Sequence, residues 1–161
     1  MENREIERKW LVKEVPEDLG KYEKLEIEQA YLSVSPAVRV RRENDDYYLT
    51  YKSSKDMPGN SPISHAEYNL PLNRASYEHL KCKRDGILIS KDRYLIPLDG
   101  GLTAELDIFK PPIEPLILVE VEFESEEEAL SFAAPDWFGE DVSLKPEYKN
   151  ASMALSAQIM G

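Results

Sequence analysis

Two glutamates and a lysine occupy alternate positions near the start of the chain, at Glu5, Glu7 and Lys9. In a β-strand these three side chains would point to one face, and the apolar Ile6 and Trp10 would point to the other. Neighbouring side chains on one face of a strand lie about 6–7 Å apart. The two carboxylates could therefore share one hard cation or its water shell, which would offset their mutual repulsion. The spacing predicts a metal-binding site.

The same alternation of charged residues returns in later segments, and each pair carries mostly one sign. The pairs are Arg39 and Arg41, Lys91 and Arg93, Glu105 and Asp107, and Glu120 and Glu122, while Lys52 and Glu67 add single charges. The residues between them are mostly apolar, which predicts strands with one buried face and one charged face. A solvated sheet face usually mixes the two signs, because like charges on neighbouring positions repel. Acidic and basic pairs on different strands therefore favour a ligand-binding surface.

Alternating hydrophobicity predicts the elements that position these pairs. Strands are expected near residues 4–12, 27–34, 37–43, 46–52, 64–72, 87–96, 102–109 and 116–124, with tight turns at 44–46 and 99–101. Ser125 and Glu128 form a capping-box pattern that begins a helix ending near residue 133. Asn73 begins another helix that ends near residue 83, and a last helix follows Asn150. The predicted fold is mainly β, with an antiparallel sheet and a few helices.

An antiparallel sheet of eight strands could close into a barrel, whose lumen is wide enough for side chains or for one small ligand. The lumen would hold carboxylates together with lysines and arginines, and the apolar outer face would need helical cover. Charges are costly to remove from water without partners. A divalent cation for the carboxylates and a polyanion for the bases would meet both needs, which points to a metal-bound oligophosphate.

Length and composition agree with one globular domain over residues 1–161, of which 42% are hydrophobic. The formal charge of −11 argues against nucleic-acid binding, which depends on a basic footprint. The charged N-terminal segment lacks the apolar run of a secretion signal, and no stretch approaches the roughly 20 apolar residues of a membrane span. A cytoplasmic location without a membrane partner is therefore expected. The lone Cys82 excludes an internal disulfide.

The charged motifs, taken in order, resemble those of the CYTH family, also called triphosphate tunnel metalloenzymes. The similar segments are Glu5-x-Glu7-x-Lys9, Gln29-Ala30-Tyr31-Leu32, Arg39-Val40-Arg41, Leu49-Thr50-Tyr51-Lys52, Lys91-x-Arg93, Glu105-Leu106-Asp107, Val119-Glu120-Val121-Glu122-Phe123 and Tyr148-Lys149-Asn150. The resemblance covers nearly the whole chain and implies an eight-stranded antiparallel β-barrel tunnel with a few covering helices. It also implies a triphosphate ligand with Mg²⁺ or Mn²⁺, since family members hydrolyse inorganic tripolyphosphate, thiamine triphosphate or RNA 5′-triphosphate ends, or cyclise ATP.

Carried over position by position, the resemblance implies roles for the paired charges. Metal ligation falls to Glu5, Glu7, Glu120 and Glu122, while Asp107, Glu67 and Glu105 complete a second metal site or orient the bases. Phosphate binding falls to Lys9, Arg39, Arg41, Lys52, Lys91 and Arg93. All-oxygen ligands suit Mg²⁺ or Mn²⁺, and planar guanidinium groups bind phosphate oxygens in pairs. One departure is Asn69, where the family often has a second glutamate, so a second metal is expected to bind less tightly.

The hypothesis that follows is a metal-dependent triphosphatase, which acts on inorganic tripolyphosphate or another small triphosphate by in-line attack of water. Catalysis would fall to Glu5, Glu7, Lys9 and Arg41, with Glu67 accepting the proton of the water. Two alternatives stay open. One is an adenylate cyclase, for which the sequence identifies no adenine pocket; the other is a non-catalytic oligophosphate-binding module, which would not need clustered carboxylates.

A few other features bear on partners and on the limits of the site. Apolar outer surface left uncovered by so few helices would allow a homodimer. His65 and His79 are isolated in the sequence, and both are expected at the surface. Two interpretations of Lys145 stay open, a phosphate contact from the C-terminal segment and a solvated loop residue, and the ordinary exposure of lysine favours the second.

Overall fold

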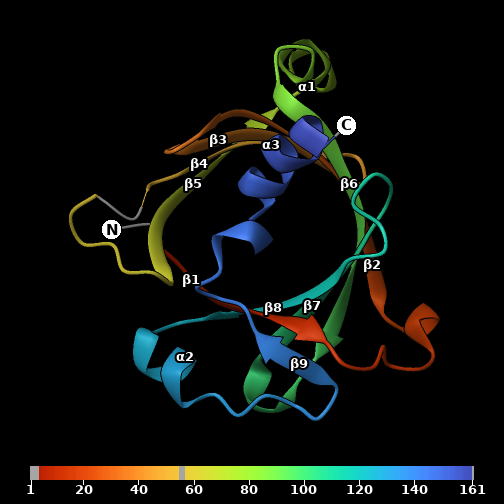
Figure 1. Ribbon diagram of the computed structural model, residues 1–161, viewed down its shortest axis with the longest axis vertical. Helices are drawn as coiled ribbons and strands as arrows, with labels where there is room; N and C mark the ends of the chain where they lie inside the picture. Colours follow the sequence, from red (N-terminus) through yellow and green to blue (C-terminus); the bar gives the residue numbers. More distant parts are fainter. Residues whose placement is uncertain (1–3, 55–56, 161) are drawn as a thin grey trace.

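Nine strands form one antiparallel sheet in the computed structural model, which describes residues 4–54 and 57–160, with side chains up to Leu155. The strands are β1 (Arg4–Val12), β2 (Glu23–Val34), β3 (Ala37–Glu43), β4 (Asp46–Lys52), β5 (Ser64–Leu72), β6 (Asp85–Pro97), β7 (Thr103–Phe109), β8 (Ile117–Phe123) and β9 (Phe138–Asp141). Their order is β5-β4-β3-β2-β6-β7-β8-β1-β9, and a further pairing of β5 with β1 closes the first eight into a barrel (Figure 1). The predicted eight-stranded antiparallel barrel is confirmed.

The observed strands differ most from the predicted ones at β2 and β9. β2 begins at Glu23 rather than at residue 27, because β6 pairs with it from the Glu23–Leu95 position onward. β9 was not predicted, because a strand of four residues is too short to show an alternating pattern. β9 forms because the end of β1 offers it a pairing edge and because Phe138 packs on the Trp10 ring, with ring centroids 4.8 Å apart.

The three predicted helices form, as α1 (Arg74–Lys81), α2 (Glu126–Ser131) and α3 (Asn150–Met160), and the first two end earlier than predicted. The caps of α1 and α2 are the predicted ones. The Ser76 amide donates to Asn73 Oδ1 at 2.7 Å, and the Glu128 amide donates to Ser125 Oγ at 3.1 Å. Short 3₁₀ turns lie at Leu19–Lys21, Asp99–Gly101 and Pro146–Tyr148. Across the described part of the chain, none of the helices has both the length and the apolarity to cross a membrane.

The outer face of the barrel is covered at two places. Tyr77 of α1 is fully buried against Ala30 of β2 and Val40 of β3. On the other side, α2 and β9 cover a cluster that includes Trp10 and Val121. These contacts determine which face of a strand is turned outward, because side chains alternate between the two faces. Residues next to the buried apolar ones therefore point into the lumen.

Helix α3 fills one end of the barrel instead of covering its outside (Figure 1). Met153 and Ala154 pack against Ile89 and Phe109, which lie on the lumen side of β6 and β7. The approach to β6 is close at Gly86: a Cβ there would lie 2.4 Å from the Ala154 carbonyl oxygen, and the backbone has φ +72°. The lumen is thus apolar at the α3 end and charged beyond it.

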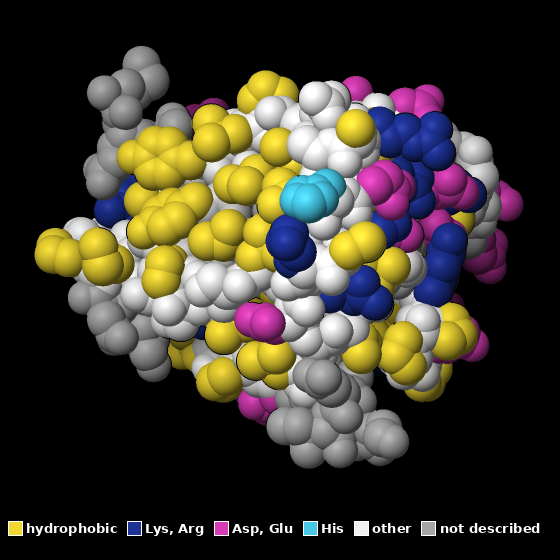
Figure 2. All heavy atoms as spheres, turned by 90° about the horizontal axis from the view of Figure 1, so that it is seen from above, with side chains coloured by type: hydrophobic (Ala, Val, Ile, Leu, Met, Phe, Trp, Pro, Cys, Tyr) yellow, Lys and Arg dark blue, Asp and Glu magenta, His cyan; other side chains and the backbone are white. Residues whose placement is uncertain are grey.

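Some apolar surface stays exposed on the outside of the barrel. Tyr68 and Leu70 of β5 are 41% and 57% exposed. Figure 2 shows apolar side chains gathered on one side of the face seen from above, with charged side chains on the other. The homodimer that such a surface would allow stays a prediction.

Candidate active site

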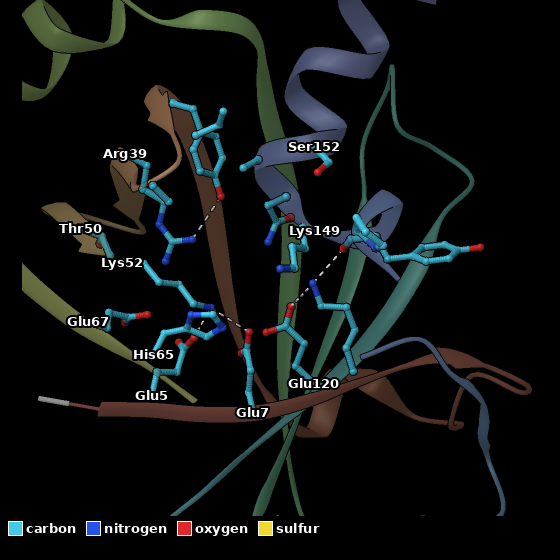
Figure 3. Close-up of a pocket in the computed structure, with 18 of the residues that line it drawn as sticks. Glu5, Glu7, Arg39, Thr50, Lys52, His65, Glu67, Glu120, Lys149 and Ser152 are labelled. Atoms are coloured by element: carbon cyan, nitrogen blue, oxygen red, sulfur yellow. Dashed lines mark hydrogen bonds and ion pairs between the residues drawn. The ribbon is translucent and has the colours of Figure 1, made fainter. Parts of the chain in front are cut away.

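The alternate charged residues of the strands share one cavity of about 760 Å³ inside the barrel. Its walls include most of the predicted site residues, namely Glu5, Glu7, Lys9, Arg39, Arg41, Lys52, Glu67, Arg93, Glu105, Glu120 and Glu122. Lys91 and Asp107 are fully buried behind this wall. Figure 3 shows Glu5 and Glu7 rising from β1, with Lys52 and Arg39 above them. Strand pairing therefore gathers charges from distant parts of the sequence.

The carboxylates of β1, β7 and β8 lie on adjacent strands and face one another. Glu7 is opposite Glu122, and Glu105 is opposite Glu120. Burial, together with repulsion from Glu120 and Glu5, raises the pKa of Glu7 to about 7. Burial and the nearby Glu5 and Glu105 also raise the pKa of Glu122 to about 7. A divalent cation would relieve this repulsion between oxygen donors.

Lys52 lies among these carboxylates. Its Nζ is 2.5 Å from Glu5 Oε1 and 3.2 Å from Glu7 Oε1. Burial lowers the pKa of Lys52, but the attraction of Glu7 and Glu5 outweighs burial and the net pKa is raised. The structure therefore places this predicted phosphate ligand next to the predicted metal ligands.

The chemistry of the donor set fits a hard divalent cation. Glu5, Glu7 and Glu122 offer only oxygen atoms, and burial raises the pKa of all three. In the described ranges 4–54 and 57–160, no group of three or more carboxylate, His or Cys side chains is already arranged to hold a metal ion. Because the Lys52 ammonium bonds two of these carboxylates, a cation that takes these oxygens would release the ammonium toward the rest of the cavity.

Two arginines of β3 form the basic side of the cavity. Arg39 lies beside Tyr31, with its Nη1 3.4 Å from the tyrosine hydroxyl oxygen. The Arg41 guanidinium donates to Gln29 Oε1 and to Glu43 Oε1. Burial lowers the pKa of Arg41, and the neighbouring cations Arg39 and Arg93 lower it further. This cluster of cations favours an anion in the space beside it.

A buried ion network lies between the two sides. Asp107 accepts from Lys91 Nζ at 2.7 Å and from Arg93 Nε at 2.7 Å, and Arg93 Nη1 also donates to Glu105 at 2.8 Å. Arg93 and Lys91 lower the pKa of Asp107 in spite of its burial, and burial lowers the pKa of Lys91 to about 8. Asp107 thus orients two bases, and its predicted role as a metal ligand stays a prediction.

Glu120 contacts the bases as well as the other carboxylates. Lys9 Nζ is 3.4 Å from Glu120 Oε1, and Arg93 Nη2 is 3.6 Å from Glu120 Oε2. Burial alone would raise the pKa of Glu120, but Lys9 and Arg93 lower it well below its usual range. Lys9 also donates to the Tyr148 carbonyl oxygen at 2.9 Å, which ties β1 to the segment before α3.

That segment supplies a wall of the cavity that the charged strand pattern did not reveal. Lys145, Lys149 and Ser152 line the cavity, and Figure 3 shows Lys149 and Ser152 across the cavity from Arg39. Lys145 is exposed as predicted and pairs with Glu140 Oε2 at 2.5 Å. A cavity built mainly by strands is therefore completed by the chain that follows β9.

The prediction that His65 lies at the surface is wrong. His65 is 7% exposed, lies opposite Glu5 in the β1–β5 pairing and lines the cavity. Its Nδ1 is 3.1 Å from the Ser53 carbonyl oxygen. The signal that could have found it is the alternation on β5, where His65, Glu67 and Asn69 occupy every second position. His79 is exposed, as predicted.

Asn69 also has a clear structural place. Its Oδ1 accepts from Thr50 Oγ1 at 2.6 Å, and its Nδ2 donates to Glu67 Oε1 at 3.2 Å. The amide therefore orients the Glu67 carboxylate from the neighbouring position on the lumen face.

The fold and the cavity together define a class of protein. A closed β-barrel whose lumen holds both carboxylates and guanidinium groups is suited to an anion that carries its own divalent cation.

The comparison with known families agrees with this class. The model of the CYTH domain matches residues 3–152, and the chain belongs to the CYTH family. Membership implies a divalent metal cofactor. The chain is 37% identical to an inorganic triphosphatase of Nitrosomonas europaea, covering 94% of this chain and 97% of that protein. It is 32% identical to an inorganic triphosphatase of Acetivibrio thermocellus, covering 93% of this chain and 92% of that protein.

Solved structures share the fold. The crystal structure of an inorganic triphosphatase superposes with a TM-score of 0.67 at 36% identity, and the match covers 94% of each chain. A Hippeastrum protein described as a putative adenylyl cyclase with a dominant triphosphatase activity superposes with a TM-score of 0.57 at 16% identity, covering 78% of this chain and 82% of that one. The second likeness concerns the fold alone.

Proposed function

We propose that this protein is a metal-dependent triphosphatase that hydrolyses inorganic tripolyphosphate. The observation that carries the proposal is that one cavity holds two kinds of charged group. Carboxylates with a raised pKa at Glu5, Glu7 and Glu122 favour a bound cation, and the cluster of cations around Arg39 and Arg41 favours a bound anion. Tripolyphosphate with a divalent cation supplies the cation for the carboxylates and the anion for the arginines. The two relatives named inorganic triphosphatase support the choice of substrate.

Each side of the cavity has its own task in the proposed reaction. Glu5, Glu7 and Glu122 hold the divalent cation, with Glu120 beside them. When bound, Mg²⁺ or Mn²⁺ supplies positive charge to phosphate oxygens and lowers the pKa of water. Arg39, Arg41, Lys9 and Arg93 bind the phosphate chain and offset the charge that develops on its oxygens during in-line displacement.

Lys52 and Glu67 have more specific roles in this proposal. The Lys52 ammonium, which bonds Glu5 and Glu7, would bind a phosphate oxygen if these two carboxylates held the cation. Glu67 accepts the proton of the attacking water at a carboxylate oxygen, and the Asn69 amide at 3.2 Å holds that carboxylate in place. Lys91 and Asp107 keep Arg93 oriented from behind the cavity wall.

The test is phosphate release from tripolyphosphate, ATP and thiamine triphosphate, each with Mg²⁺, Mn²⁺ or EDTA, together with an assay for cyclic AMP. Metal-dependent release of phosphate from tripolyphosphate is the expected result. Cyclic AMP and pyrophosphate from ATP would identify a cyclase instead. Binding of all three without turnover would identify a non-catalytic binding module.

Variants connect the activity to this cavity. Glu5→Ala and Arg41→Ala should abolish turnover while the circular dichroism spectrum stays that of a folded barrel. Glu17→Gln and Lys83→Gln are matched controls, because both residues are exposed and lie outside the cavity. Undiminished hydrolysis in Glu5→Ala or Arg41→Ala would overturn the assignment of the site. The cytoplasmic location stays a prediction.

A further inference from the structure

Gln29 of β2 holds the Arg41 side chain from inside the barrel wall. The two residues lie opposite each other in the β2–β3 pairing, and Gln29 is fully buried. Its Oε1 accepts two hydrogen bonds from one guanidinium group, from Nε at 2.9 Å and from Nη2 at 2.7 Å. Arg41 is itself only 7% exposed, so these bonds fix the direction of its guanidinium plane.

Arg93, which lines the same cavity, is held in a different way. Arg93 donates to Asp107 at 2.7 and 2.9 Å and to Glu105 at 2.8 Å, and it lies 3.6 Å from Glu120. Carboxylates position Arg93 and offset its charge at the same time. An amide oxygen positions a guanidinium group without adding negative charge.

Stability alone does not explain an amide at position 29. Within the described part of the chain, Gln29 Nε2 is buried without a hydrogen-bond partner, and an unpaired buried donor costs free energy. A glutamate of the same shape would have no such donor and would make charge-assisted bonds to Arg41. Glutamine at position 29 thus leaves a buried donor unpaired, but it does not offset the positive charge of Arg41 as a glutamate would.

We propose that Gln29 is a positioning residue that aims Arg41 at the phosphate chain through a neutral acceptor, so that the positive charge of Arg41 is kept for the substrate. The inference rests on the proposed function, because it takes a phosphate chain as the anion beside Arg41. It adds to that function a residue that does not line the cavity. The neutral side chain of this residue keeps negative charge away from the phosphate site.

Glu43 provides the opposite perturbation at the same guanidinium. Its Oε1 lies 3.1 Å from Arg41 Nη1, and its side chain is 26% exposed. Gln29→Glu adds a carboxylate beside Arg41, and Glu43→Gln removes one. Both changes preserve side-chain shape and an acceptor for the guanidinium.

The experiment measures the dissociation constant of tripolyphosphate by calorimetry, with EDTA to prevent turnover. Gln29→Glu should raise this constant by about tenfold or more, while its melting temperature without ligand is equal to or above that of the wild type. Glu43→Gln should lower the constant or leave it unchanged, and the double variant should return it toward the wild-type value. Lys83→Gln, which changes the net charge as Gln29→Glu does, should bind like the wild type.

The possible outcomes separate this inference from the proposed function. Wild-type affinity in Gln29→Glu, or weaker binding in both single variants, would overturn the inference even if the wild type hydrolyses tripolyphosphate. If Gln29→Glu does not fold, weaker binding in Glu43→Gln alone overturns it, and tighter binding supports it. If the affinities follow the expected order but the wild type releases no phosphate, the proposed hydrolase activity is overturned. The role of Gln29 in binding the anion then still stands.

Discussion

Replacing Glu7 by Gln should make the metal-free protein more stable at alkaline pH while it removes a proposed metal ligand. Glu7 faces Glu122 across the β1–β8 pair, and burial with repulsion from Glu120 and Glu5 raises its pKa to about 7. A glutamine resembles the protonated glutamate and carries no charge. The substitution therefore removes repulsion that the wild type must bear whenever Glu7 is ionised.

The size of the effect follows from the two pKa values. Because the pKa of Glu7 in the folded state lies above its ordinary value of 4.5, the stability that this group contributes is fully present below that value and is lost as the pH rises through about 7. A pKa displaced from 4.5 to about 7 corresponds to a loss of about 3 kcal/mol at about pH 8 and about 1 kcal/mol at about pH 5.5. The advantage of Glu7→Gln should thus grow by about 2 kcal/mol between the two conditions, or about 4–8 °C in melting temperature.

The assay is thermal unfolding in EDTA, and then in Mg²⁺ or Mn²⁺, at about pH 5.5 and about pH 8. The cation should stabilise the wild type more at the higher pH, where protons no longer compete for the carboxylates, and should stabilise Glu7→Gln much less. Glu17→Gln is the control, since Glu17 is an exposed glutamate outside the cavity. A Glu7→Gln protein that is less stable than the wild type in EDTA at about pH 8, or a difference that does not change with pH, would refute the reasoning.

Three further substitutions test the packing around the site. Asp107→Ala leaves Lys91 and Arg93 buried without their shared carboxylate, so the free energy of unfolding in urea should fall by about 3–5 kcal/mol; a loss of less than about 1 kcal/mol would show that the network is not needed. Ser125→Ala removes the cap of α2 and should cost about 1 kcal/mol in the same measurement, with hydrolysis unchanged; a change in activity would contradict the view that α2 only covers the outer face. Tyr77→Phe removes a hydroxyl that donates to a β2 carboxylate and should also cost about 1 kcal/mol; no change in urea unfolding would mean that the bond adds nothing to stability.

The strands and their lumen faces could be predicted because alternation is a local property of the sequence. A residue at every second position points to the same face whichever strand lies next to it, so Glu5, Glu7 and Lys9 had to share one side. The same rule would have placed His65 beside Glu67, but a histidine without a second histidine or another metal ligand nearby in the sequence does not indicate a site. β9 and the bounds of the helices depend on contacts with distant segments, which local sequence patterns do not predict.

The sequence by itself determined the barrel strands, the segregation of acidic and basic pairs and the kind of ligand that such pairs can hold. Only the tertiary structure decided which charges are partners, because register and barrel closure set the distances between residues far apart in the chain. It placed Lys52 between Glu5 and Glu7, and it paired Glu120 with Lys9. It also put the amide of Gln29 against Arg41, since a hydrogen bond across two strands exists only when both strands are in place.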